Sequence, residues 1–240
     1  MSFYYPTEDT NLNIARGLVR GTSVRNIFGY NDKIPTSDFV PAWELPEEYV
    51  YPTQNTNVDV VSLSNNDTDV SILISGLDSD YNPVEEVVDL TGTTPVTSNT
   101  EFFRINDVIT VSGNAEGNVN ITDTSNSDIT YARIREGDGK NQASIYTVPA
   151  GHSLFLTRIN VFCSAGTSPK ENEFRNLSIT PNGRVIRAGQ TRFLQEMTIE
   201  RTVPFRYEEK TDIQLQVKSY NTEHFSGVFA EAILIKDGLS

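Results

Sequence analysis

The chain has 240 residues, of which 37% are hydrophobic and 21% are charged, and its formal net charge at pH 7 is −13. This length suits one large β domain or two ordinary ones, and the hydrophobic share is sufficient for packed cores. No run approaches the roughly 20 apolar residues of a membrane helix, and the first residues, MSFYYPTEDT, lack the basic and apolar regions of a secretory signal. The single cysteine, Cys163, excludes an intrachain disulfide framework and fits synthesis in a reducing cytoplasm.

Residues 1–50 predict an extended N-terminal arm, because Gly and Pro interrupt every potential long element. The segment still carries much apolar surface, which must be buried against its own domain or against a neighbouring subunit. We favour the neighbouring subunit, as in a symmetric oligomer. Arginines pair with carboxylates and aromatic rings are enriched at interfaces. The expected interface residues of the arm are Arg16, Arg20, Arg25, Phe28, Tyr30, Trp43 and Tyr49.

Residues 51–135 predict a first β-sandwich, since short alternating apolar runs are separated by turn residues. We expect strands at 58–63, 70–75, 84–90, 102–111, 119–122 and 129–134. No run in the chain has apolar residues at the i, i+3, i+4 and i+7 positions of a helix. The polar stretch Glu136–Asn141 is the best candidate for a domain boundary.

Residues 136–240 predict a second β-sandwich, with strands at 144–148, 154–163, 174–179, 185–186, 213–217 and 225–235. Residues 190–201 fit either a strand or a short helix. Ile213, Leu215 and Val217 alternate with polar residues, so we expect one face of that strand to meet solvent. In the strand 154–163, the residues expected on one face are Phe155, Thr157, Ile159, Val161 and Cys163.

The acidic charge is concentrated in the predicted first sandwich. Residues 51–135 hold thirteen acids and three arginines, a net charge of −10, whereas residues 136–240 are neutral. A protein that reads duplex DNA needs a basic face, so we expect no duplex DNA partner. The acidic block is either a solubilising surface or the solvent side of a molecule whose C-terminal part packs against partners. Charge asymmetry alone does not decide between these two interpretations.

Catalytic and cofactor motifs are missing from the sequence. There is no G-x-S-x-G elbow and no nucleotide-binding glycine motif. His152 and His224 are interpreted as solvated polar residues rather than catalytic bases. Cys163 has no second cysteine nearby, which makes a zinc site improbable and fits an inert buried thiol. We therefore predict no enzyme activity, no cofactor and no metal.

One acidic segment partly matches a calcium loop. Asp78, Asp80 and Asn82 take positions one, three and five, and Asp89 takes position twelve. Position six is Pro83 instead of the glycine that the turn needs, and no helices flank the segment. A hairpin loop is the favoured interpretation. The adjacent residues 85 and 86 are both glutamates, which point to opposite faces of a strand and so cannot form a paired acid and base.

Several stretches resemble known proteins. The stretches ISGLDSDYN, VVDLTGTTPVT and FFRIN, between residues 74 and 106, resemble a family of virion structural proteins from tailed phages, many of them marine. The stretches IYTVPAGHSLFLTRINVF, TDIQLQVKS and GVFAEAILI are similar to a jelly-roll-like module that recurs in phage structural proteins. ARGLVRGTSVRNIFGYN looks like the start of such proteins. The resemblance implies a virion component that is made in the host cytoplasm.

Together these observations predict an all-β protein with an extended arm (1–50), a first β-sandwich (51–135) and a jelly-roll-like second one (136–240). We expect a non-enzymatic homo-oligomer that decorates or reinforces the phage head and contacts other virion proteins, such as the major capsid protein, but no membrane. Two alternatives are a neck or tail accessory protein and a receptor-binding or glycan-binding module of a fibre. A third is a carbohydrate-active hydrolase, which needs two carboxylates about 5 to 10 Å apart.

Overall fold

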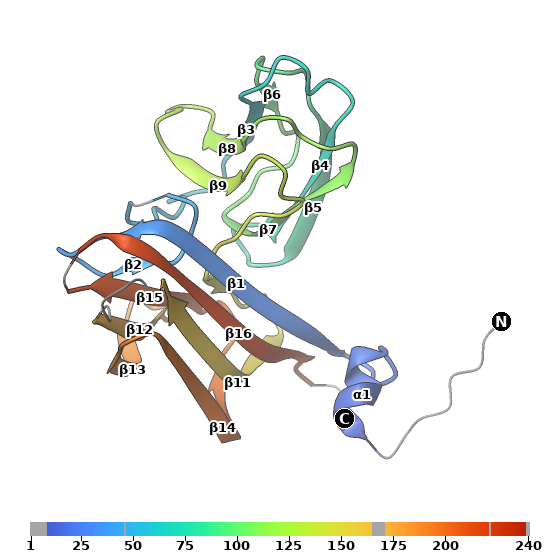
Figure 1. The fold of residues 1–240 in the computed structure, drawn as a ribbon. Helices are drawn as coiled ribbons and strands as arrows, with labels where there is room; N and C mark the ends of the chain where they lie inside the picture. The colour runs from blue at the N-terminus through green and yellow to red at the C-terminus, as the bar shows by residue number, and fades with distance from the viewer. Residues whose placement is uncertain (1–8, 46, 165–170, 221, 239–240) are drawn as a thin grey trace.

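The computed structural model describes residues 9–45, 47–164, 171–220 and 222–238. These residues form sixteen strands and one short helix, and every strand pair is antiparallel. The all-β prediction is therefore confirmed. Figure 1 shows the strands gathered into two units, each of which contains two sheets. No helix in this part of the chain has the length and apolar character needed to cross a membrane.

The first unit packs two sheets around one core. One sheet has the order β6-β3-β8-β9 and the other the order β5-β4-β7. Ile72, Phe102 and Ile121 are fully buried in the core between them. The alternation of the sequence places these side chains inside, as predicted for the strands of this segment. The strands are β3 (Val58–Ser62), β4 (Ser71–Leu77), β5 (Pro83–Asp89), β6 (Val96–Thr97), β7 (Arg104–Ser112), β8 (Val119–Asp123) and β9 (Thr130–Ile134).

The second unit also packs two sheets around a core, with the orders β1-β16-β11-β14 and β10-β15-β12-β13, and β2 lies beside β15. Leu154, Leu215 and Val228 are fully buried between the sheets. The strands are β1 (Thr22–Ile34), β2 (Val40–Pro41), β10 (Ile145–Thr147), β11 (His152–Cys163), β12 (Asn172–Ile179), β13 (Val185–Phe193), β14 (Glu196–Tyr207), β15 (Asp212–Ser219) and β16 (His224–Lys236).

The predicted arm is largely part of this second unit, which corrects the expected division of the chain. Strand β1 pairs with β16 from Thr22 opposite Ile235 to Ile34 opposite His224. Ile27 and Ile34 are buried in the core of the second unit. The apolar surface of the segment is thus buried within its own chain, and residues 136–240 alone do not complete their unit. Residues 1–8 of the predicted arm lie outside the described residues.

A short helix, α1 (Thr10–Ala15), precedes β1 and was not predicted. The Asp9 carboxylate caps it by accepting a hydrogen bond from the backbone N–H of Leu12 at 3.1 Å. Six residues are too few to display the apolar repeat over two helical turns on which the sequence prediction relied.

Two predicted strand faces also need correction. In β11 the register shifts between Leu156 and Arg158, so Phe155 and Thr157 leave the core face that Ile159 occupies. This β-bulge reverses the alternation, which a strict two-residue period cannot anticipate.

Residues 190–201, for which the sequence left both helix and strand open, belong to β13 and β14 and their connection.

In β15 the polar side chains are buried instead of facing solvent. Gln214 and Gln216 are only 5% and 3% exposed. Arg175 of the neighbouring strand donates to the Gln216 side chain at 2.8 Å. The Phe39 ring lies 4.1 Å from the guanidinium carbon of Arg175, and β2 pairs with β15 directly after it. A segment distant in sequence therefore covers a strand face that the local pattern predicts to be open.

The two units are joined by a buried ion pair. The Arg104 guanidinium, at the start of β7, donates to both carboxylate oxygens of Asp212 in β15, at 2.8 and 3.0 Å. The rings of Tyr51 and Phe103 lie 4.6 and 4.1 Å from the guanidinium carbon. Asn106 adds two hydrogen bonds to the backbone of Thr147, at 2.8 and 2.9 Å. These contacts fix the first unit against the second.

Candidate functional site

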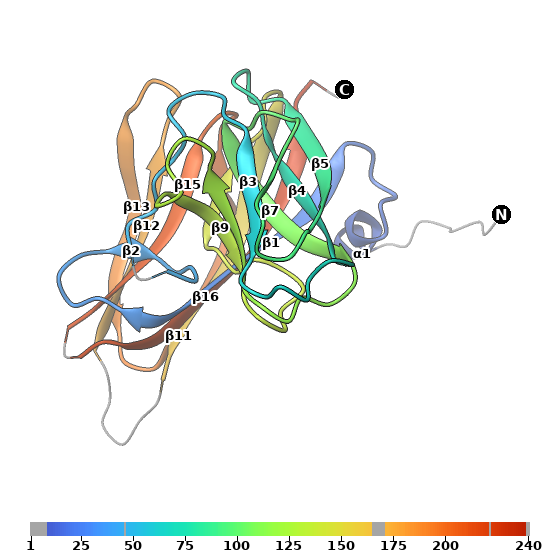
Figure 2. The same cartoon turned by 90° about the horizontal axis from the view of Figure 1, so that it is seen from above.

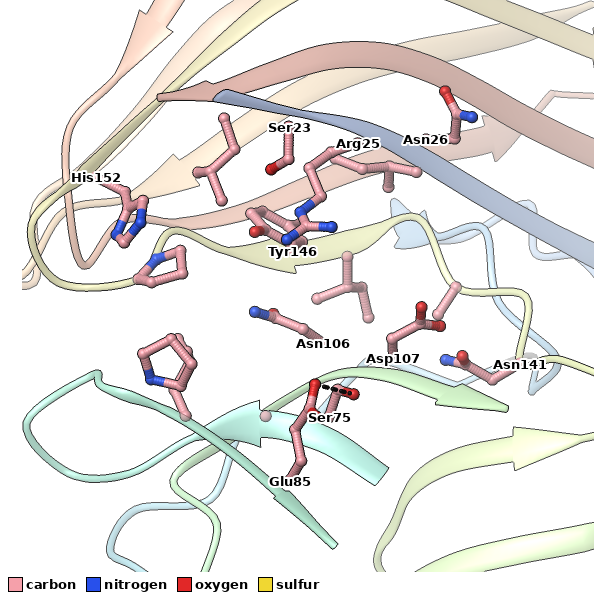
Figure 3. Close-up of a pocket in the computed structure, with 18 of the residues that line it drawn as sticks. Ser23, Arg25, Asn26, Ser75, Glu85, Asn106, Asp107, Asn141, Tyr146 and His152 are labelled. Carbon is pink, nitrogen blue, oxygen red and sulfur yellow. Dashed lines mark hydrogen bonds between the residues drawn. The ribbon is translucent and has the colours of Figure 1, made fainter. Parts of the chain in front are cut away.

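A polar cleft lies between the two units. It has a volume of about 420 Å³ and is lined on one side by β1 and the β10–β11 connection, and on the other by β4, β5 and β7. Figure 3 shows the Arg25 guanidinium projecting into the cleft close to the Tyr146 ring. Arg25 lies on β1, so the segment that the sequence predicted to be an extended arm supplies one wall of this site.

The wall formed by the second unit carries Arg25, Tyr146 and His152. Burial raises the pKa of the Tyr146 hydroxyl, while the charge and hydrogen bond of Arg25 act in the opposite direction. The Nδ1 atom of His152 lies 2.8 Å from the carbonyl oxygen of Ala150. This contact orients the imidazole, which Figure 3 shows at one end of the group of lining residues.

The opposite wall is supplied by the first unit and its link to the second. Lys140 Nζ forms an ion pair with Asp107 Oδ2 at 2.9 Å. The other oxygen of Asp107 is buried and has no hydrogen-bond partner among the described residues. The Ser75 hydroxyl donates to Glu85 at 3.0 Å. This wall therefore offers carboxylate oxygens toward the guanidinium on the other side.

This arrangement suits hydrogen bonding to a small polar ligand more than acid–base chemistry. Glu85 and Asp107 come from β5 and β7 of one sheet, and Figure 3 shows both on the same side of the cleft. A glycosidase needs two carboxylates on opposite sides of the scissile bond. Across the described ranges, no group of three or more His, Cys, Asp or Glu side chains is placed to hold a metal ion.

The expected interface residues do not form one patch. Trp43 and Tyr49 are only 2% and 5% exposed, and they pack with Ile145 of β10 in a small separate cluster. Trp43 Nε1 also donates to the carbonyl oxygen of Glu47 at 2.8 Å. The expectation that these two aromatic side chains lie at a subunit interface is therefore wrong, because they are already buried within the chain.

The other expected residues lie at separate places. Arg25 and Phe28 line the cleft. Tyr30 is half-buried, with the Arg135 guanidinium 4.2 Å from its ring centre and the Phe225 ring at 4.7 Å. Arg16 follows the last residue of α1, and Arg20 lies in the exposed turn before β1. A role of Arg16 and Arg20 in subunit contacts remains a prediction.

The other singled-out side chains have local roles. Cys163 is 8% exposed, accepts a hydrogen bond from Asn172 Nδ2 at 3.1 Å, and has its pKa raised by burial. His224 is also buried, with Nδ1 2.6 Å from the carbonyl oxygen of Thr222, which corrects its assignment as a solvated residue. The Asp78 carboxylate accepts backbone hydrogen bonds from Asp80 and Asn82, as in a turn between β4 and β5.

Exposed apolar side chains on β13, β14 and their connection were missed at the sequence level, and we call this part of the molecule the β13–β14 surface. Strands β13 and β14 are the last strands of the two sheets of the second unit. Val185, Leu194 and Val203 are 59%, 56% and 79% exposed. Met197, Ile199 and Phe205 pack against the core but are only partly buried. The sequence signal was the cluster of apolar residues at 193–205 without a clear period, which predicted neither a face nor an element.

No protein family matches the chain, and no curated protein matches it. A structure of the Gx strain of infectious bursal disease virus has 13% sequence identity and a TM-score of 0.21, with 90% of this chain and 72% of that chain covered. A mutant VP2 protein of the same virus, in derived T=1 particles, has 11% identity and a TM-score of 0.21, with 91% and 71% covered. Similarity at this level assigns the chain to no family.

Proposed function

We propose that this chain is a non-enzymatic structural component of a tailed-phage virion, built from two β-sandwiches of which the second is jelly-roll-like. It decorates or reinforces the head through contacts between its own copies and with other virion proteins. The observation that carries the proposal is the set of exposed apolar side chains, Val185, Leu194 and Val203, on β13, β14 and their connection. The similarity of sequence stretches in both units to phage structural proteins supports the same function.

The surface on β13 and β14 has the properties of an association site. The two strands are edge strands of nine and twelve residues. A long edge strand with exposed apolar side chains favours association with another chain. Met197 and Phe205 point toward the core but are incompletely covered. A neighbouring molecule placed here would complete the packing at this side of the second unit.

The experiment compares incorporation of variants into phage particles. A double variant, Leu194→Asp with Val203→Asp, places two charges on the β13–β14 surface. The matched control is Leu63→Asp, since Leu63 is 60% exposed on the first unit. Each variant complements a phage that lacks the gene, and mass spectrometry measures its copy number in purified particles. We expect incorporation to fall at least about tenfold for the double variant and to stay normal for the control.

Two outcomes would contradict the proposal. One is the absence of the wild-type chain from purified particles. The other is equal incorporation of the double variant and the control. A neck or tail accessory protein would also use the exposed surface, but it would be present in far fewer copies per particle than a head decoration protein.

The cleft favours a second candidate function, a glycan-binding module of a fibre. Its volume of about 420 Å³ lies in the range of small-ligand pockets. Arg25 and Asp107 offer donor and acceptor groups on opposite walls, and Tyr146 offers an aromatic ring. A glycan array distinguishes the candidates: binding that Arg25→Ala abolishes would support the fibre module, while normal particle incorporation of the same variant would separate the two functions.

A further inference from the structure

The first unit ends in an acidic strand edge. Strand β5 is the outer strand of the sheet β5-β4-β7, and within the described chain no strand pairs with its other side. Glu85, Val87 and Asp89 are exposed, and Val87 is 54% exposed. Glu86 adds a further carboxylate, which accepts the backbone N–H groups of Asn99 and Thr100. Glu85 and Asp89 each accept a hydrogen bond from a serine of β4, from Ser75 at 3.0 Å and from Ser71 at 2.6 Å, and Glu85 also lines the cleft. We call the exposed residues 85, 87 and 89 the acidic edge.

The second unit ends in a basic strand edge. Strand β13 is the outer strand of the sheet β10-β15-β12-β13 and likewise has one unpaired side in the described chain. Arg184, Val185 and Arg187 are exposed, with Val185 at 59%. None of the ion pairs among the described residues includes Arg184 or Arg187. We call the exposed residues 184, 185 and 187 the basic edge.

Arg187 also lies close to a second guanidinium. Arg175, on β12, has its pKa lowered by burial and by the charge of Arg187. Its guanidinium carbon lies 4.1 Å from the centre of the Phe39 ring, and Arg175 donates to Gln216. The carboxylates of Glu173, Asp38 and Glu48 act on Arg175 in the opposite direction. Arg187 belongs to none of the ion pairs of the described residues, so its exposed guanidinium is the group that favours an acidic partner. An incoming carboxylate would relieve their mutual repulsion.

The charges on the two edges are selective. Charged side chains on an edge strand oppose pairing with an identical edge. Two acidic edges repel each other, and so do two basic edges, but an acidic edge and a basic edge attract. Each edge also presents one exposed valine, Val87 or Val185, among its charges. The pattern therefore discourages like contacts and favours a mixed contact.

The positions of the edges determine the symmetry that such a contact can have. Figures 1 and 2, two perpendicular views, both show β5 and β13 on opposite sides of the molecule. A two-fold dimer uses the same surface on both copies, whereas a contact between different surfaces repeats from one copy to the next. A contact between the edges therefore joins copies head to tail.

We propose that the acidic edge of one copy docks on the basic edge of the next copy, so that the chain assembles head to tail. The proposal rests on the proposed function, since it names the partner for one end of the exposed β13–β14 surface. Val87 and Val185 meet at the centre of the contact, and the carboxylates of Glu85 and Asp89 meet the guanidinium groups of Arg184 and Arg187. The register shift of β13 after Arg187 limits backbone pairing to the first part of this strand.

The test is a charge exchange in solution. Variant A carries Glu85→Lys and Asp89→Lys, and variant B carries Arg184→Glu and Arg187→Glu. The control for variant A is Asp128→Lys with Glu136→Lys, two exposed acids away from β5. Analytical ultracentrifugation of the full chain at low salt measures assembly of wild type, of each variant alone, and of an equal mixture of A and B.

We expect wild type and the control to assemble, and salt to weaken the assembly. Variants A and B alone place like charges opposite each other, so their dissociation constants rise at least about tenfold. The mixture restores assembly, because the lysines on β5 of variant A then meet the glutamates on β13 of variant B. Misfolding of either variant cannot produce this restoration.

A wild-type chain that stays monomeric at about 100 μM overturns the proposal. Stable assemblies bury a larger interface area than transient contacts, so the contact should form at this concentration. Assembly of variant A or B alone as strong as that of wild type, or a mixture that does not recover, also overturns it. These results leave the virion function intact, since incorporation into particles is measured separately. Conversely, restored assembly with no chain in particles would reject the virion function alone.

Discussion

At the scale of single residues, the junction between the units depends on buried charged groups. Arg104 and Asp212 are 10% and 6% exposed and form a bidentate pair. The Thr147 hydroxyl donates to the same carboxylate at 2.6 Å. Burying an ion pair stabilises little by itself, but removing one partner leaves an uncompensated charge inside the protein. The pair therefore acts mainly by making separation of the units costly.

The first prediction concerns Arg104. Arg104→Met should lower the free energy of unfolding by about 3–5 kcal/mol, because Asp212 is left buried without its partner. The control is Lys140→Met, whose ion pair with Asp107 is 52% and 37% exposed and should contribute about 0–1 kcal/mol. Urea denaturation measures both variants. Equal effects of the two substitutions would contradict the assigned role of the buried pair.

The second prediction concerns Glu44, which lies beside the junction. Its side chain accepts the backbone N–H of Gln142, while its Oε2 atom is buried without a hydrogen-bond partner in the described structure. Burial raises the pKa of Glu44 to about 8, although Arg133 and Arg135 oppose this shift. The folded state thus holds a proton that the unfolded state releases near pH 4.5.

Wild-type stability should therefore fall as the pH rises from about 4.5 to about 8, because only the folded state still binds the proton in this range. Glu44→Gln removes this dependence and should stabilise the protein by a few kcal/mol at pH 8.5 relative to wild type, with little difference at pH 4.5. Thermal melts at both pH values check this. An equal effect of the substitution at the two pH values would reject a buried, protonated Glu44.

At the scale of elements, the sequence predicted most strands, but it did not predict that β1 and β2 belong to the second unit. The strands from 58 to 134 follow from alternation and turns, and they pair with one another within this part of the chain. Strand β1 pairs with β16, about two hundred positions away, so no local pattern could assign it. Glycine at position 29 read as a break in the arm, yet it lies inside β1. Position 29 holds a glycine because the backbone of Ala42 and Ser144 approaches it closely, not because the chain turns there.

The third prediction tests that approach. A Cβ atom at position 29 would overlap the backbone of Ala42 and Ser144. Gly29→Ala should lower the free energy of unfolding by about 2–3 kcal/mol or more, because backbone atoms cannot move aside as side chains do. Gly139→Ala is the control, since nothing lies within 4 Å of its Cβ position. If both substitutions are tolerated equally in denaturant melts, β1 is not packed as described.

At the scale of the whole molecule, the second unit is built from two parts of the chain that flank the first unit. Strands β1 and β2 come before it and β10 to β16 after it. The chain therefore passes the junction twice, and Arg104 and Asn106 join the units there. This explains why the polar stretch 136–141 marks a real connection but not the limit of an independent domain.

The candidate surfaces show the same limit of sequence reasoning. The residue types at the cleft are visible in the sequence, but Arg25 and Asp107 line one cleft only through the placement of the two units. Trp43 and Tyr49 looked like interface residues because composition does not say what covers them. The apolar surface on β13 and β14 became visible only when both strands proved to be sheet edges.

The most direct test of the central claim, that this chain is a structural component held in a virion by its β13–β14 side, is a cryo-EM map of intact particles of the phage that encodes it. The account predicts repeated density for the two units on the head, with β13 and β14 of each copy covered by a neighbouring subunit. Particles without such density, or copies whose β13–β14 surface faces solvent, would contradict it.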